Sequence, residues 1–119
     1  MGLDLFAHGV DPQAFQDLPT VLCGSMFTDG QSSIRGKVYA GFISDICDVD
    51  IYQEKLPTKD LQRIVTQLSV YYAGAADPTN TNAVYTLHKS WGFSLKEVKG
   101  LLDWFTVIKE NNGQVIGWW

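Results

Sequence analysis

The stretch "SLKEVKGLLDWFTVIKENNGQVIGWW", residues 94–119, carries the two patterns that decide the fold. Apolar residues recur at helical spacing through its first half, and Ser94 with Glu97 makes a capping box, which predicts a helix beginning here. Asn112-Gly113 is a typical helix end. The closing QVIGWW is rich in β-branched and aromatic residues, so it predicts a strand directly after the helix.

Working outward, the N-terminal stretch "GLDLFAHG", residues 2–9, partly alternates between apolar and other residues. The alternation places Leu3, Leu5 and Ala7 on one face and predicts a short strand. A terminal strand frays unless a sheet holds it. We therefore expect the N-terminal and C-terminal strands to pair with each other.

A second clear helical pattern covers residues 56–75. Thr58 is the expected cap and Gly74 the expected stop of this helix. The apolar stripe that should face the core consists of Leu61, Ile64, Val65, Leu68 and Tyr72.

Three weaker local signals complete the outline. Asp11 followed by Pro12 predicts a helical turn or two. Asp29-Gly30 predicts a chain reversal. Residues 83–93 are compatible with a short helix.

Residues 34–46 allow two interpretations. Their apolar residues step by four, which favours a helix capped by Ser32 or Ser33. Gly36 and Gly41 oppose it, because glycine in a helix interior costs about 1 kcal/mol relative to alanine. A strand is the alternative that the pattern leaves open.

These elements predict an α+β protein: about three helices packed on a small, mainly antiparallel sheet that pairs the N- and C-terminal strands. The length of 119 residues fits a single globular domain, residues 1–119. With 45% hydrophobic and 18% charged residues, the composition is that of a folded chain. No stretch has the ~20 apolar residues of a membrane span, and no secretion signal is recognisable. We therefore expect a cytoplasmic protein, without membrane contact, whose Cys23 and Cys47 are buried free thiols.

The charge distribution excludes one class of function. The net charge is −4, and four aspartates precede the first cation, Arg35. Nucleic-acid binding needs clustered Lys and Arg to neutralise phosphates. We therefore expect no nucleic-acid partner.

The segment "DVDIYQ", residues 48–53, alternates with period two and predicts a strand. Val49 and Ile51 would then face the core, while Asp48 and Asp50 would share the outer face. These two aspartates are the candidate metal ligands, and a metal-assisted hydrolase centred on them is one functional alternative. A calcium loop is excluded, because the segment lacks the glycine and the ligand spacing that such a loop requires.

A second candidate site could bind a small anion or a nucleotide. Arg35 and Lys37 lie at the expected start of a helix, where backbone N–H groups favour anions. Tyr39, Tyr52 and Trp119 could stack against a ring. The candidate ligand-binding residues are therefore these five.

The chain has no nucleophile elbow, phosphate-binding loop or dinucleotide-binding glycine pattern. His8 and His88 lack neighbours that would make them catalytic, and Cys47 lies among carboxylates that disfavour a thiolate. The leading hypothesis is therefore a small non-catalytic binding protein that acts through a protein partner and needs no cofactor. An inhibitor carried by a phage or a mobile element would suit this size, and a homodimer is compatible with the sequence.

Overall fold

The computed structural model describes residues 2–16, 18, 22, 26–28 and 31–119. The chain reversal expected at Asp29-Gly30 and the thiol of Cys23 lie outside these residues. The elements in chain order are β1 (Asp4–His8), the 3-10 turn η1 (Pro12–Phe15), β2 (Met26–Thr28), β3 (Gln31–Ile34), α1 (Gly36–Cys47), α2 (Thr58–Ala75), α3 (Thr81–Trp91), α4 (Leu95–Glu110) and β4 (Gln114–Trp118).

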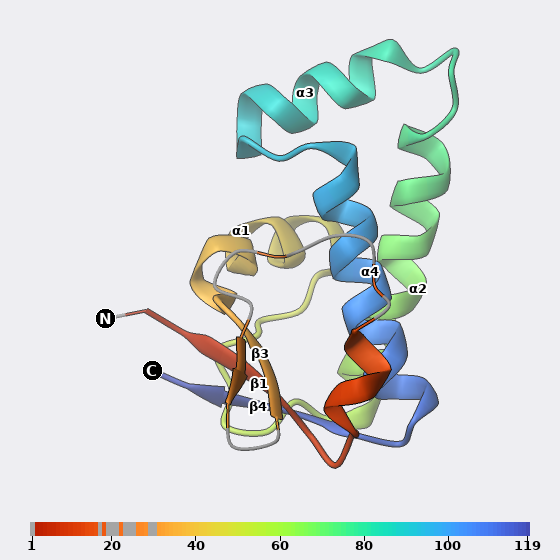
Figure 1. The fold of residues 1–119 in the computed structure, drawn as a ribbon. Coiled ribbons are helices and arrows are strands. Elements are labelled where there is room, and N and C mark those ends of the chain that lie inside the picture. The colour runs from red at the N-terminus through yellow and green to blue at the C-terminus, as the bar shows by residue number, and fades with distance from the viewer. Residues whose placement is uncertain (1, 17, 19–21, 23–25, 29–30) are drawn as a thin grey trace.

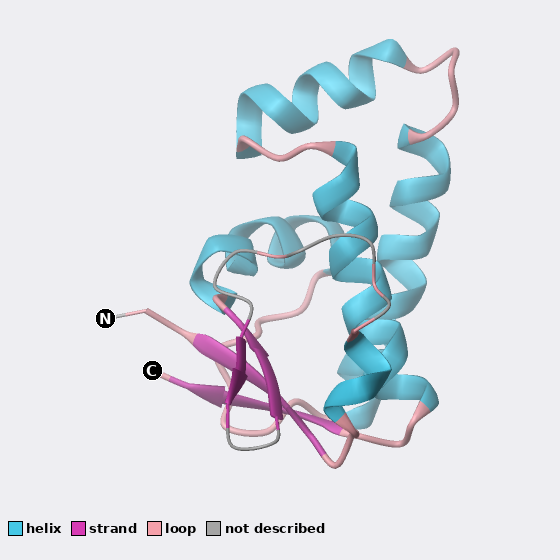
Figure 2. Ribbon diagram, viewed as in Figure 1, coloured by secondary structure: helices cyan, strands magenta, loops and turns pink. Residues whose placement is uncertain are grey.

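The described strands form one antiparallel sheet in the order β2-β3-β1-β4 (Figure 2). The pairing of β1 with β4 runs from Asp4 opposite Trp118 to His8 opposite Gln114. The expected pairing of the N- and C-terminal strands is thus confirmed, and the two chain ends lie side by side (Figure 1).

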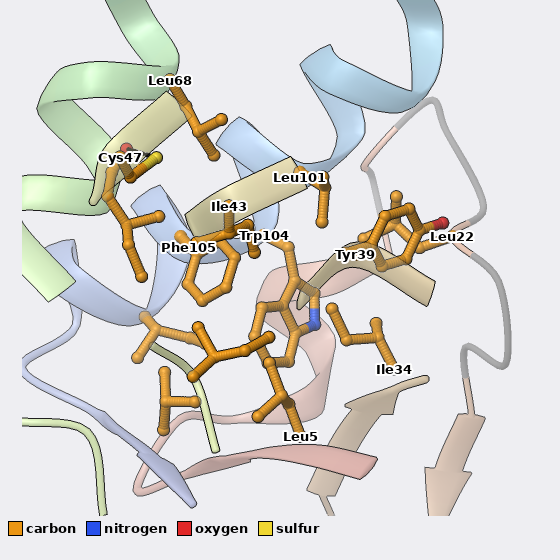
Figure 3. Close-up of a cluster of buried hydrophobic side chains, with 14 of the residues drawn as sticks. Leu5, Leu22, Ile34, Tyr39, Ile43, Cys47, Leu68, Leu101, Trp104 and Phe105 are labelled. Atoms are coloured by element: carbon orange, nitrogen blue, oxygen red, sulfur yellow. Dashed lines mark hydrogen bonds between the residues drawn. The ribbon is translucent and has the colours of Figure 1, made fainter. Parts of the chain in front are cut away.

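One face of the sheet carries the core. Leu3, Leu5 and Ala7 are buried, whereas the residues between them are not, as the alternation predicted. The helices lie on the side of these buried residues (Figure 1). Figure 3 shows Leu5 of β1 and Ile34 of β3 below the side chains of α1, α2 and α4. The α+β class, with helices packed on a small antiparallel sheet, is confirmed.

The helix expected after Ser94 is α4, and the Ser94 hydroxyl accepts the backbone N–H of Glu97 at 3.3 Å. Helix α2 was also predicted correctly, but its ends differ from the expectation. Pro57 stands at its cap position, and the helix runs through Gly74 to Ala75. Packing does not require glycine here, because a Cβ at Gly74 would have no heavy atom within 4 Å. The short helix expected in residues 83–93 is α3, which makes four α-helices in the described chain.

Most of the ambiguous segment 34–46 is helix, α1, whereas Ile34 ends β3. The expected caps of this helix were wrong. Ser32 and Ser33 belong to β3, where long-range pairing with β1 determines their conformation. The Ser32 hydroxyl instead accepts the indole N–H of Trp104 at 3.1 Å, between two buried side chains. Helix α1 begins after Arg35, without a side-chain cap.

The strand expected over residues 48–53 was also wrong. Asp48 has the left-handed backbone conformation (φ 56°) that ends α1, and Asp50 accepts the backbone N–H of Tyr52 at 2.9 Å in a local turn. Both features bend the chain away from the straight path that strand pairing needs. The burial expectation still held, because Val49 and Ile51 are buried while Asp48 and Asp50 are exposed.

The part of the chain after this turn runs beside β4 and continues the hydrogen bonding of the sheet. Leu56 N–H donates to Val115 O at 2.9 Å, and Gly117 N–H donates to Glu54 O at 3.0 Å. These bonds pair much of the outer edge of β4 with the segment 54–56. None of the described helices is long and apolar enough to cross a membrane.

Candidate functional site

The face of the sheet that the helices leave open carries apolar side chains. Phe6 and Ile116 are half-buried and oppose each other on β1 and β4. Together with His8 and Trp118 they line an open cavity of about 280 Å³. Trp118 is 73% exposed. We call these four residues the outer sheet face.

A second, smaller hollow lies at the end of β4. Glu54, Gly117, Trp118 and Trp119 line this open cavity of about 160 Å³. The ring of Tyr52 meets that of Trp119 edge-on, with 5.9 Å between the centroids. We call this group, Tyr52 included, the end pocket. Trp118 lines both the end pocket and the cavity of the outer sheet face, so the two hollows are neighbours.

Close backbone packing shapes the end pocket. A Cβ on Gly117 would lie 2.3 Å from the carbonyl oxygen of Gln53 and 3.2 Å from the Trp119 ring. Glycine at this position therefore lets the segment 53–56 lie against β4 and lets the indole of Trp119 lie over the backbone. The Gly117-to-Glu54 hydrogen bond holds the same two segments together.

The five predicted ligand-binding residues fall into two groups. Tyr52 and Trp119 are in contact at the end pocket. Arg35, Lys37 and Tyr39 lie at the start of α1, where Arg35 Nε donates to Asp4 Oδ1 at 3.0 Å. Lys37 is exposed next to this ion pair.

Tyr39 lies in the core and cannot stack against a ligand in this structure. It is fully buried, and its ring packs on Phe93 with 5.3 Å between the centroids. Its hydroxyl donates to Glu97 Oε2 at 3.2 Å. The burial of Tyr39 could have been predicted from the apolar stripe of α1, since Tyr39 lies one helical turn from the buried Ile43.

The two predicted metal ligands take part in local contacts. Asp50 Oδ1 accepts the backbone N–H of Tyr52, and Asp48 Oδ2 lies 3.8 Å from Arg63 Nη2. Within the described ranges, no three His, Cys, Asp or Glu side chains gather in a way that could hold a metal ion.

The remaining chemical candidates lie apart from the two hollows, except His8. His88 is exposed in the last turn of α3. Cys47 is buried, and burial raises the pKa of its thiol to about 12, although Arg63 partly opposes the shift. A thiol with such a pKa is protonated at neutral pH and is a poor nucleophile.

Sequence reasoning named Tyr52 and Trp119 of the end pocket but missed Phe6, Ile116, Trp118 and Glu54. The available signal was the alternation of the terminal strands, which directs Phe6 away from Leu5 and Ala7. Glu54 had no such signal, because its place depends on the long-range pairing with Gly117. Comparison of the chain with protein-family models, with curated proteins and with solved structures finds no significant match.

Proposed function

We propose that this chain is a small non-catalytic binding protein that engages a protein partner through the outer sheet face. The observation that supports it is the open row of Phe6, Ile116 and Trp118 across β1 and β4. A sheet with one covered face normally directs polar residues to the other face. Apolar and aromatic residues gathered on an open face mark an interaction surface.

The composition of this face supports a protein as its occupant. Tryptophan contributes disproportionately to the binding energy of protein interfaces, and Trp118 is largely exposed. The cavity beside it is open, which suits a side chain that arrives from another surface. No contact of the described residues favours the anion-binding or the metal-hydrolase alternative over this proposal.

A peptide-display selection against the purified protein tests the proposal. We expect enriched peptides that carry apolar side chains and that lose binding to the variant Ile116→Thr. Threonine keeps the β-branched shape suited to a strand, and thermal unfolding followed by circular dichroism verifies that the variant folds. Val84→Thr is the matched control, because Val84 is an exposed β-branched residue (42%) that lies on α3 and not on the sheet.

Two results would contradict this function. One is a selection that enriches no peptide above background. The other is binding that survives Ile116→Thr but is lost in Val84→Thr. A second copy of the chain could also occupy the outer sheet face. Light scattering across a concentration series would then show a dimer by its molar mass, and Ile116→Thr would abolish that dimer.

A further inference from the structure

We infer that the end pocket receives the ammonium or guanidinium group of a Lys or Arg side chain on the protein partner. The identity of the occupant rests on the proposed function, whereas the cation preference rests on the pocket itself. Glu54, Trp118 and Trp119 line the pocket at this end of β4, and the ring of Tyr52 contacts that of Trp119. That combination of groups recognises organic cations in proteins.

The aromatic rings provide the first part of the argument. Trp118 is 73% exposed, Trp119 49% and Tyr52 40%, so each ring retains surface for a ligand. The face of an aromatic ring carries negative charge density, and tryptophan attracts cations more strongly than the other rings. The edge-on contact between Tyr52 and Trp119 restricts the orientation of both rings before a ligand arrives.

Charge provides the second part. Glu54 is the charged residue among those that line the pocket. Lys55 is the cation next to it in sequence, but Lys55 pairs with Ile116 in the sheet register and does not line the pocket. The chain's net charge of −4 also favours a basic partner over an acidic one.

The third part is the rigidity of the frame. Glu54 O accepts from Gly117 N–H at 3.0 Å, and Leu56 N–H donates to Val115 O at 2.9 Å, which ties the segment to β4 on both sides of Lys55. These bonds fix the backbone of Glu54 relative to β4 before a ligand binds. A preorganised site loses less conformational freedom when the ligand enters.

The shared Trp118 connects this pocket to the outer sheet face. A partner that covers Trp118 on the outer sheet face therefore also borders the end pocket. We therefore expect the displayed peptides to carry Lys or Arg close to their apolar anchor.

The test uses lysine blocked at both backbone ends as the probe and the equally blocked norleucine, which lacks the ammonium group, as its neutral counterpart. The intact protein is titrated at constant ionic strength while proton–nitrogen NMR follows the indole N–H signals of its four tryptophans. We expect a saturable shift of the Trp118 and Trp119 signals with a millimolar dissociation constant. The buried Trp104 serves as an internal reference.

Two variants separate charge from aromatic contact. Glu54→Gln should weaken lysine binding about threefold, which is typical of an exposed ionic contact. Trp119→Ala should abolish the saturable shift. Glu110→Gln is the control, because Glu110 is an exposed carboxylate at the end of α4 and should leave the affinity unchanged.

The inference is overturned if norleucine shifts the same signals as strongly as lysine, if Glu54→Gln binds like the unaltered protein, or if lysine produces no saturable shift. None of these results bears on the proposed function, which the peptide selection with Ile116→Thr tests independently. Conversely, lysine binding with no enriched peptide would retain the cation pocket and remove the protein partner.

Discussion

At the residue scale, the structure is most demanding where backbone segments approach each other closely. Gly117 is such a position, because its hydrogen sits where a Cβ would meet the Gln53 carbonyl at 2.3 Å. Gly74 is the opposite case, with open space around its hydrogen in the exposed part of α2. Packing therefore requires glycine at position 117 but not at position 74.

Alanine at these two glycines should change stability in opposite directions. Gly117→Ala should lower the free energy of unfolding by about 1–3 kcal/mol, because the methyl group forces the segment 53–56 away from β4. Gly74→Ala should raise it by about 0.5–1 kcal/mol, because alanine suits a helix interior and restricts the unfolded chain. Urea unfolding of both variants measures these changes, and a Gly117→Ala protein as stable as the unaltered chain would contradict the close approach.

The candidate site residues show what the sequence can reveal about single side chains. Tyr52 and Trp119 were recognised as candidates because aromatic rings can stack against the ring of a ligand. Tyr39 shares that chemistry but is buried against Phe93. The residue type was thus informative, while its exposure depended on which face of α1 meets α4.

At the element scale, the four helices differ in how they begin. Helix α4 has a side-chain cap from Ser94, whereas α2 follows Pro57 and has none. Thr58, which the sequence favoured as a cap, is the first residue inside α2. Both caps were predicted from the same residue preference, and only the structure separates them.

The two hydroxyl residues should therefore respond differently to substitution. Ser94→Ala should lower the free energy of unfolding by about 1 kcal/mol, because the Glu97 N–H loses its hydrogen-bond acceptor. Thr58→Ala should change it by less than about 0.5 kcal/mol. Thermal or urea unfolding compares the variants, and equal losses in both would show that the hydroxyl of Ser94 is not a stabilising cap.

At the scale of the whole molecule, α3 projects from the body formed by the sheet and the other helices (Figure 1). Leu87 is its only fully buried residue among the described ones, whereas six residues of α4 are buried. Trp91 at its end contacts Phe42 edge-on, with 5.7 Å between the ring centroids. A helix with so little buried surface depends weakly on the common core.

Amide hydrogen exchange should reveal this difference under native conditions. We expect the amides of α3 to exchange through local openings of lower free energy than those of α4 and β1. The reason is that α3 can separate while the core between the sheet, α2 and α4 stays intact. Comparable protection in α3 and α4 would instead indicate a single cooperative unit.

The sequence by itself determined the local elements whose patterns were strong: α4, α2 and the two terminal strands, including their antiparallel pairing. The elements follow from periodicity and capping, which act between near neighbours in the chain. Their pairing was expected because a terminal strand frays unless a sheet holds it. Only the tertiary structure decided that Ser32 and Ser33 lie in a strand, that residues 48–53 form a turn, and that Glu54 lines the same cavity as Trp118 and Trp119. Those placements depend on backbone hydrogen bonds and side-chain contacts between segments far apart in sequence, and no local pattern specifies which sheet edge such a segment will join.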